Sequence, residues 1–217
     1  MASSFTTKSA DSNSGVSRIF ENARTCTRCY PDDEIYVPLP DPNNSMGKSE
    51  IIFINERPGR VGTGKSGYVS FDNDDPTATF FRECFEAASL DRDKVFITNA
   101  CICHPVIDGY KDTQPKIAEL VQCHFWLHQQ LEVVRPSLIV TVGWSALQSV
   151  LRYYGRWPVR DKLTFGAWVG RLIDDNDPWI YPVAHTSLKG RANRRATLQH
   201  SDWLEIPKIL RRARNFT

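Results

Sequence analysis

Four short runs of apolar residues recur along the chain, and longer segments with helix-like apolar spacing separate them. Each run has the length of a buried strand. The predicted strands are 51–54, 94–98, 137–142 and 179–183. The predicted helices are 17–29, 76–89, 115–133, 143–153 and 201–213. The helix at 76–89 has the clearest start, because Asp75 can cap free N–H groups and Pro76 fits the first helical position.

The alternation of strands and helices predicts an α/β fold with three α/β/α layers and a four-stranded, mainly parallel central sheet. Residues 1–16 are rich in Ser and Thr and are expected to form a flexible tail, which leaves 17–217 as a single domain. In parallel sheets, functional side chains gather in the loops that leave the carboxyl ends of the strands. Here those loops hold Glu56, Asn99, Gly143 and His185.

Composition narrows the class of protein. Hydrophobic residues make up 41% and charged residues 24% of the 217 positions, which is enough for a packed core. No apolar run approaches the ~20 residues of a membrane-spanning helix, and the first residues lack the apolar centre of a signal peptide. We therefore exclude a membrane protein, a secreted disulfide mini-domain and a fibrous protein, and expect a soluble intracellular protein.

Charge is unevenly distributed. The net charge is only +2, but residues 185–217 contain eight Lys or Arg against Asp202 and Glu205, which gives that segment +6. A basic segment of this kind could steer a polyanion such as DNA, or it could simply be the solvated face of a helix.

Six cysteines offer a candidate metal site. Cys26 and Cys29 have the C-x-x-C spacing with which two thiolates grip one metal centre. A zinc ribbon would place a second such pair nearby, whereas here the partners must come from Cys101, Cys103 or Cys123. A redox pair, or two incidental thiols, is the alternative interpretation.

Residues 59–66 match the phosphate-binding pattern G-x-x-x-x-G-K-[ST] and follow a predicted strand. That motif requires a helix to begin at Lys65 and Ser66, so that its N-terminus faces the phosphates. The next residues, 67–76, instead look extended, then turn-like and acidic. A P-loop NTPase is therefore the third choice among the functions considered.

Four motifs in a fixed order suggest a family. They are Cys26-x-x-Cys29, N-E-R-P-G at 55–59, I-T-N-A-C-I-C-H-P at 97–105 and H-T-S at 185–187. Together they resemble the uracil-DNA glycosylase superfamily over about residues 26–205, most closely the iron–sulfur family 4 type. The pattern of that type is C-x-x-C, G-E-x-P-G, I-T-N-x-x-x-C-x-P, a Cys within the next helix, and H-P-S. The resemblance implies that a [4Fe–4S] cluster is held by Cys26, Cys29, Cys103 and Cys123, with zinc as the alternative metal, and that Cys84 and Cys101 are ordinary buried residues.

The chemistry of base excision suggests roles for the residues at the strand ends. Breaking an N-glycosidic bond produces a cation-like sugar and an anionic base, which call for a carboxylate and for hydrogen-bond donors. Glu56 is the candidate carboxylate, Asn99 the reader of the base edge, and His185 the donor to the base oxygen or a phosphate contact. Each also has a structural interpretation, as a surface acid, a turn cap and a buried histidine respectively.

Further candidates follow from the extrusion of a base. The expelled base needs an aromatic surface, for which Phe71 is preferred over Tyr68. By resemblance, the DNA-intercalating loop contains Ser187, Leu188, Lys189 and Arg191, with an apolar tip and basic neighbours.

The chain also departs from the family pattern. Asn55 replaces the first Gly of its motif and could take part in water activation or narrow the base pocket. Gly62 and Thr63 replace an acidic pair, and Thr186 replaces the Pro of H-P-S. These changes fall at the base pocket, so they leave the choice of base open.

The function expected is that of a DNA glycosylase in base excision repair, which hydrolyses the N-glycosidic bond of uracil or a related deaminated base and leaves an abasic site. A non-catalytic DNA-binding module of the same fold is the alternative. We expect DNA as the partner, no membrane, a monomeric state and a cytoplasmic, nucleoid-associated location.

Overall fold

The computed structural model describes residues 8–44, 49–106, 112–158, 164–175 and 177–215. Its helices are α1 (Lys8–Ala23), α2 (Thr63–Ser66), α3 (Pro76–Ala87), α4 (Ile117–Val134), α5 (Trp144–Tyr153), α6 (Phe165–Trp168), α7 (Leu188–Asn193) and α8 (Ala196–Arg214). Its strands are β1 (Ile35–Tyr36), β2 (Leu39–Pro40), β3 (Ile51–Asn55), β4 (Tyr68–Val69), β5 (Val95–Asn99), β6 (His104–Pro105), β7 (Leu138–Val142) and β8 (Trp179–Val183).

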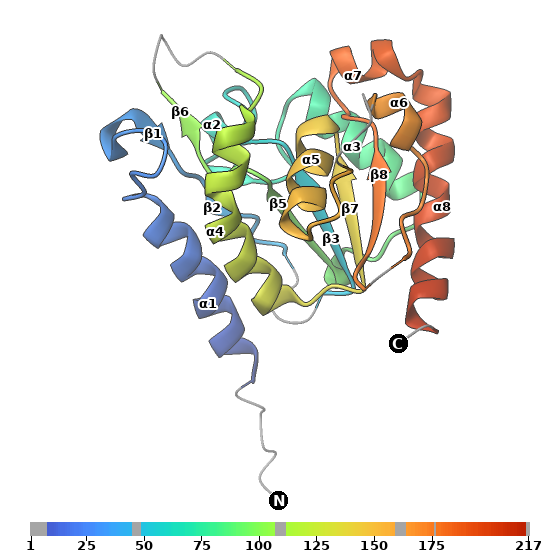
Figure 1. Cartoon of the computed structure of the whole chain (residues 1–217), viewed down its shortest axis with the longest axis horizontal. Coiled ribbons are helices and arrows are strands. Elements are labelled where there is room, and N and C mark those ends of the chain that lie inside the picture. Colours follow the sequence, from blue (N-terminus) through green and yellow to red (C-terminus); the bar gives the residue numbers. More distant parts are fainter. Residues whose placement is uncertain (1–7, 45–48, 107–111, 159–163, 176, 216–217) are drawn as a thin grey trace, which may run out of the picture.

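A four-stranded parallel sheet forms the centre of the molecule, with the strand order β5-β3-β7-β8. All residues of β5, β7 and β8 are buried, as are the first four of β3, because helices cover both faces. The four strands of this sheet point the same way, so their carboxyl ends share one edge, which lies beside α2, α6 and α7 at the top of Figure 1. The predicted fold class is confirmed.

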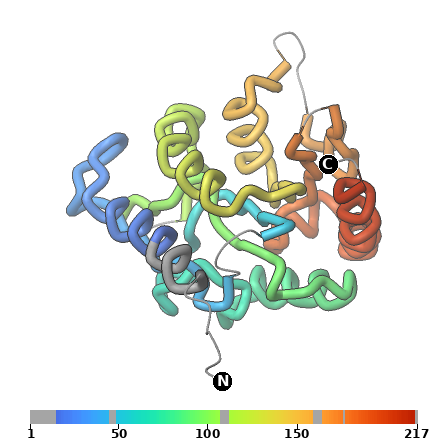
Figure 2. Tube along the Cα trace, turned by 90° about the horizontal axis from the view of Figure 1, so that it is seen from below, coloured from blue at the N-terminus to red at the C-terminus, as the bar shows by residue number. Residues whose placement is uncertain are grey.

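Helices form the two outer layers. Figure 2 shows α4 and α5 on one side of the central strands and α3 on the other. On the α3 side, the ring of Phe53 in β3 stacks on Trp203 of α8 at 5.2 Å between centroids, and it meets Phe81 of α3 at 5.4 Å. These contacts join the sheet to two helices that are far apart in the sequence.

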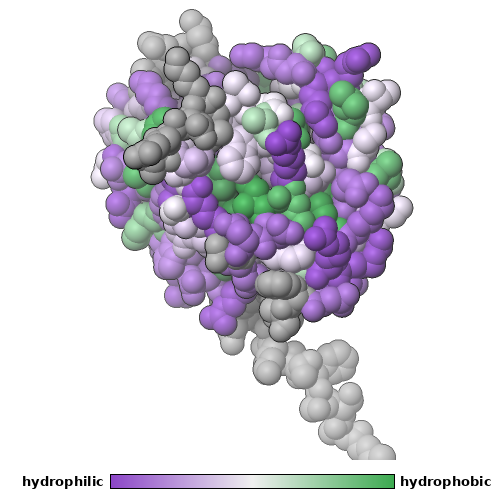
Figure 3. All heavy atoms as spheres, turned by 45° about the vertical axis from the view of Figure 1, so that its right-hand side comes forward, coloured by the Kyte–Doolittle hydropathy of each residue, from purple (hydrophilic) through white to green (hydrophobic). Residues whose placement is uncertain are grey.

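The surface is mainly hydrophilic on the face shown in Figure 3, where hydrophobic residues form a limited central band. Among the described residues, no helix combines the length and the apolar character that crossing a bilayer requires.

Several element boundaries differ from those predicted. The first helix spans Lys8–Ala23 rather than 17–29, so part of the expected tail is helical. The last helix begins at Ala196 rather than 201. The short helices α2, α6 and α7 and the two-residue strands were not predicted, because such short elements show no measurable period. The predicted start of α3 is confirmed: Asp75 Oδ1 accepts hydrogen bonds from the N–H groups of Thr77 and Ala78.

The loop that matches the phosphate-binding pattern has a different geometry from a P-loop. Helix α2 ends at Ser66, where a P-loop helix would begin, and Gly67 terminates it in the left-handed region at φ 81°. The chain then enters the short strand β4. The expectation that no helix starts at Lys65 and Ser66 is confirmed.

Candidate active site

A cavity of about 1060 Å³ opens at the carboxyl edge of the sheet. This volume is slightly above the range of about 300–1,000 Å³ that is usual for small-molecule pockets. The ends of all four strands contribute to its lining, through Asn55, Glu56, Asn99, Gly143 and His185. Thus the structure brings together the residues that the sequence placed at strand ends.

Glu56 follows β3 and is held at the start of α5. The backbone N–H of Ser145, in the first turn of that helix, donates to Glu56 Oε1 over 3.2 Å. A helix N-terminus carries unpaired N–H groups and a partial positive charge, which favour a carboxylate. This contact gives the acid a fixed orientation at the wall of the cavity.

Gly143 separates Glu56 from His185. Its φ is +94°, a region that favours glycine. A Cβ at this position would lie 2.8 Å from Glu56 Oε1 and 3.2 Å from Cβ and Cδ2 of His185. The acid and the imidazole therefore approach the same point on the backbone, and only a residue without a side chain leaves room for both.

The tautomer of His185 follows from its backbone contact. The N–H of Ser187 donates to His185 Nδ1 over 3.1 Å, so Nδ1 carries no proton and Nε2 is the donor of the neutral ring. Burial lowers the pKa of His185, and the nearby carboxylates of Glu56 and Asp75 offset part of that shift. The ring is therefore a neutral N–H donor at physiological pH.

Asn55 and Asn99 are direct neighbours in the parallel pairing of β3 with β5. Asn99 is buried, with 5% of its surface exposed, and lines the cavity. Asn55 also lines it, and its side-chain amide donates to the carbonyl of Thr98 over 3.4 Å. Two amides therefore occupy one end of the cavity, and the amide of Asn55 is tied to the neighbouring strand.

Of the two aromatic candidates, Phe71 lines the cavity and Tyr68 does not, among the described residues. The ring of Phe71 stacks on Phe81 with centroids 5.3 Å apart and contacts Phe85 at 5.1 Å. The guanidinium of Arg92 lies over it at 5.2 Å. Sequence reasoning did not predict these contacts, which anchor Phe71 to the hydrophobic core.

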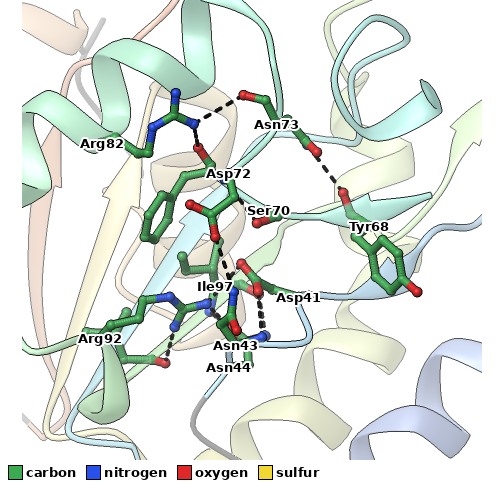
Figure 4. Close-up of polar contacts among 12 residues, drawn as sticks. Asp41, Asn43, Asn44, Tyr68, Ser70, Asp72, Asn73, Arg82, Arg92 and Ile97 are labelled. Atoms are coloured by element: carbon green, nitrogen blue, oxygen red, sulfur yellow. Dashed lines mark hydrogen bonds and ion pairs between the residues drawn. The ribbon is translucent and has the colours of Figure 1, made fainter. Parts of the chain in front are cut away.

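Polar contacts hold the loop that carries Phe71 (Figure 4). Arg82 of α3 donates to the carbonyl of Phe71 over 2.6 Å and to that of Asn73 over 3.2 Å. Arg92 forms an ion pair with the fully buried Asp41 at 2.9 Å. Arg82 therefore holds the backbone of this loop, and Arg92 connects the ring of Phe71 to Asp41.

The expected DNA-contacting residues form the start of α7. Ser187 caps this helix by accepting from the N–H of Gly190 over 3.2 Å. Leu188 is 70% exposed, and Lys189 lines the cavity beside it. Arg191 lies instead with its guanidinium over the ring of Phe80 at 4.9 Å. Three of the four residues are therefore at the cavity, while Arg191 packs on α3.

Much of the basic charge near the C-terminus is paired within the chain. Arg194 binds Asp202 at 2.5 Å, Lys208 binds Glu205 at 2.6 Å, and Arg212 is 3.4 Å from Asp174. Arg214 pairs with Glu50, which precedes β3 and so lies at the sheet edge opposite the cavity. The formal charge of residues 185–217 therefore overstates the positive charge available at the site.

Sequence reasoning missed two features of the cavity. Asp75, identified only as a helix cap, also lines it and acts electrostatically on His185. Trp144 lines it too, in contact with the rings of Trp157 at 5.6 Å and Phe165 at 5.9 Å. The acidic run at 72–75 hinted at the first, whereas the aromatic contacts depend on tertiary packing.

A second, small cavity is lined by the four cysteines that the family resemblance selected, Cys26, Cys29, Cys103 and Cys123. Trp126 Nε1 donates to the sulfur of Cys26 over 3.3 Å. Among the described residues, no three Cys, His, Asp or Glu side chains are arranged to hold a metal ion.

The thiols around Cys123 form a coupled group. Hydrogen bonds from Cys101 and Cys103 lower the pKa of Cys123 to about 4, and the same bonds, with burial, raise the pKa of both donors. Burial also raises the pKa of Cys29 to about 11. Cys84 is buried on α3, as expected, whereas Cys101 contacts Cys123 and is not an isolated packing residue.

The donor set fits an iron–sulfur cluster in its chemistry. Such a cluster takes one thiolate per iron, so four cysteines around a common cavity are the ligands that it requires. Cys26 and Cys29 follow α1, Cys103 follows β5 and Cys123 belongs to α4. A group held by these four would join the N-terminal segment to the loop beside the candidate active site.

Comparison with known proteins gives consistent matches. Residues 42–205 match the model of the Uracil DNA glycosylase superfamily. A type-4 uracil-DNA glycosylase of Archaeoglobus fulgidus is 32% identical over 139 residues, 63% of each chain. One of Saccharolobus solfataricus is 30% identical over 134 residues, 58% of this chain and 54% of the relative. A type-5 uracil-DNA glycosylase of Pyrobaculum aerophilum is 27% identical over 177 residues, 76% and 71% of the two chains. The chain thus spans between half and two thirds of the length of these type-4 relatives.

Proposed function

Because the chain belongs to the uracil DNA glycosylase superfamily, we propose that it hydrolyses the N-glycosidic bond of uracil, or of a related deaminated base, in DNA. The product is an abasic site, the starting point of base excision repair. The observation that supports this most is the meeting of Glu56, Asn99 and His185 at one cavity. The similarity to type-4 enzymes supports a divergent member of that type.

The proposed chemistry divides the charge of the transition state between two walls of the cavity. As the glycosidic bond breaks, the sugar becomes cation-like and the electron pair moves to the base. Glu56 stabilises the sugar and orients the attacking water, and its fixed contact with Ser145 avoids reorganisation during the step. His185 donates its Nε2 proton as a hydrogen bond to the base oxygen, where negative charge develops.

Base selection is assigned to the amide side of the cavity. The side chain of Asn99 offers one donor and one acceptor, which match the edge of a uracil ring. Asn55 stands one strand away, so its bulk narrows the cavity where other members have glycine. Phe71 provides an aromatic surface in the same cavity, held by Arg82 and Arg92. We propose that these residues set the range of bases accepted.

DNA engagement is assigned to the start of α7. Leu188 is the large apolar side chain with the highest exposure among those described, and it borders the cavity. Such a side chain can occupy the space that a flipped nucleotide leaves in the stack. Ser187 and Lys189, which also line the cavity, are proposed to contact the phosphates on either side of it. The protein is proposed to act as a monomer on chromosomal DNA in the cytoplasm.

The cysteine cavity is assigned a structural [4Fe–4S] cluster, bound by Cys26, Cys29, Cys103 and Cys123. The four-thiolate donor set supports this assignment. Zinc is the competing metal, and colour separates the two, since a cluster gives a brown protein with broad absorption near ~400 nm.

A panel of modified-base oligonucleotides tests the proposal. Anaerobically purified protein is incubated with oligonucleotides that contain one uracil, hypoxanthine or xanthine, single- or double-stranded, followed by alkali to cleave abasic sites. Cleavage at a deaminated base supports the glycosylase. Binding without cleavage in every context contradicts it and favours a DNA-binding module of the same fold.

A further inference from the structure

A buried ion pair connects the candidate active-site cavity, which Arg57 lines, to helix α4, which carries Glu119 and Cys123. Arg57 directly follows Glu56, and its Nη2 is 2.6 Å from Glu119 Oε1. The two side chains are only 6% and 8% exposed. Arg57 Nη1 also donates to Thr113 Oγ1 over 3.1 Å. Removing two charges from water is costly, so a buried ion pair need not stabilise the fold. We therefore looked for a functional role of this pair.

The contacts of Glu119 lead to the cysteines. The hydroxyl of Tyr30, the residue after Cys29, donates to the same Glu119 oxygen over 2.7 Å. Glu119 also precedes Cys123 by four residues on α4, so both project from one face of the helix. Glu119 therefore bonds to the neighbour of one proposed ligand, Cys29, and shares a helix face with another, Cys123.

The backbone around Arg57 makes a third connection. The N–H of Cys101 donates to the carbonyl of Glu56 over 2.9 Å, and the ring of His104 contacts the carbonyl of Pro58 at 2.8 Å. The turn that carries Glu56 and Arg57 is thus bonded to the segment that contains Cys103.

The Arg57 guanidinium has one donor that neither Thr113 nor Glu119 uses. Its Nε is buried and has no hydrogen-bond partner among the described residues. Through Glu119 and the hydroxyl of Tyr30, the guanidinium is linked to the residue that follows the proposed ligand Cys29.

We propose that Arg57 is the buried counter-charge of the four-cysteine site. The inference rests on the cysteine-bound cluster of the proposed function and is independent of which base is excised. Four thiolates around an iron–sulfur group give a net negative site, and each added electron makes it more negative. A fixed cation nearby stabilises the reduced state most, so it raises the reduction potential and helps to retain the group.

Opposite shifts in reduction potential provide the test. Wild type, Arg57→Gln, Glu119→Gln and the control Arg60→Gln are purified anaerobically, analysed for iron, sulfide and zinc, and titrated by spectroelectrochemistry. Arg57→Gln should shift the potential to more negative values and lose iron several-fold faster to a chelator. Glu119→Gln, which keeps its hydrogen-bonding shape but loses a negative charge, should shift it to more positive values. Arg60 is three residues away and exposed, so its variant should match wild type.

Arg57→Lys separates charge from shape. It keeps the positive charge but cannot bridge Thr113 and Glu119 with one planar group. Its potential should therefore stay closer to wild type than that of Arg57→Gln.

Several results would overturn the inference. These are an Arg57→Gln protein with the potential and iron retention of the Arg60→Gln control, or an anaerobically reconstituted wild type that binds no iron and sulfide. If Arg57→Gln does not fold, an unchanged potential in Glu119→Gln has the same force. Opposite shifts in a protein that excises no base would uphold the inference while the glycosylase proposal fails.

Discussion

The backbone N–H of Ser145 donates a hydrogen bond to Oε1 of Glu56 over 3.2 Å, which ties the end of β3 to the first turn of α5. This contact crosses 89 residues of sequence. It directs the carboxylate along the wall of the cavity, beside Gly143 and opposite the imidazole of His185. The catalytic proposal depends on this arrangement, and the predictions below examine its parts.

Gly143→Ala should lower turnover by more than its loss of stability can explain. The new methyl group would lie 2.8 Å from Glu56 Oε1 and 3.2 Å from His185, so both side chains must move. Misplacement of about 1 Å in an active site can cost on the order of 10²-fold in rate. Single-turnover rates and thermal unfolding of the same preparation measure the two effects.

Gly155→Ala is the matched control for that variant. Gly155 also has a positive φ, +66°, but a Cβ there meets nothing within 4 Å. It should lose about 1–2 kcal/mol of unfolding free energy from backbone strain and keep its turnover. Equal losses of turnover in both variants would show that strain, and not the contact with Glu56 and His185, accounts for the effect.

The pH profile should reflect the neutral state of His185. Burial lowers its pKa, so the ring becomes protonated only at a pH below the usual value of about 6.5. Protonation would also break the hydrogen bond that Nδ1 accepts from Ser187. The acid limb of kcat/KM should therefore lie below about pH 6.5 and disappear in His185→Gln. An acid limb above that value, or one unaffected by the substitution, would contradict the assignment.

Leu188→Ala should impair excision from duplex DNA more than from single strands. The leucine is 70% exposed, so its removal leaves stability nearly unchanged, within about 0.5 kcal/mol. A leucine buried in the DNA stack contributes roughly 1.5–3 kcal/mol, which predicts a loss of about tenfold or more on duplex substrates. Leu204→Ala, on α8 and 46% exposed, is the control. Equal effects of Leu188→Ala on both substrates would rule out the wedge role.

Much of the fold could be predicted because each central strand is a continuous run of apolar residues. Each of the four strands was located to within a residue or two, and polar residues at their carboxyl ends then fall at one edge. This is why the sequence alone predicts that Glu56, Asn99 and His185 lie close together. Strand order and register supplied the remaining detail, such as the pairing of Asn55 with Asn99.

Other features could not be predicted from the sequence, and most of these depend on tertiary contacts. Nothing local indicates that Arg191 packs on Phe80, or that Arg214 pairs with Glu50 across 164 residues. The short helix α7 lies where the sequence predicts a DNA-contacting loop. Ser187 caps it, and Gly190 packs so closely that a Cβ would lie 1.8 Å from the carbonyl oxygen of His185. This approach is local, but a six-residue helix leaves no periodic signal in the sequence.

The most direct test of the account is the rate of uracil excision by Glu56→Gln. Glutamine can still accept the hydrogen bond from Ser145, so the fold and DNA binding, followed by thermal unfolding and fluorescence anisotropy, should be preserved. Glu86→Gln, exposed on α3, controls for loss of a carboxylate. Single-turnover assays with alkali cleavage should show a fall of about 10²–10⁴-fold for Glu56→Gln alone. Wild-type rates in that variant would contradict the assignment of Glu56 as the catalytic carboxylate.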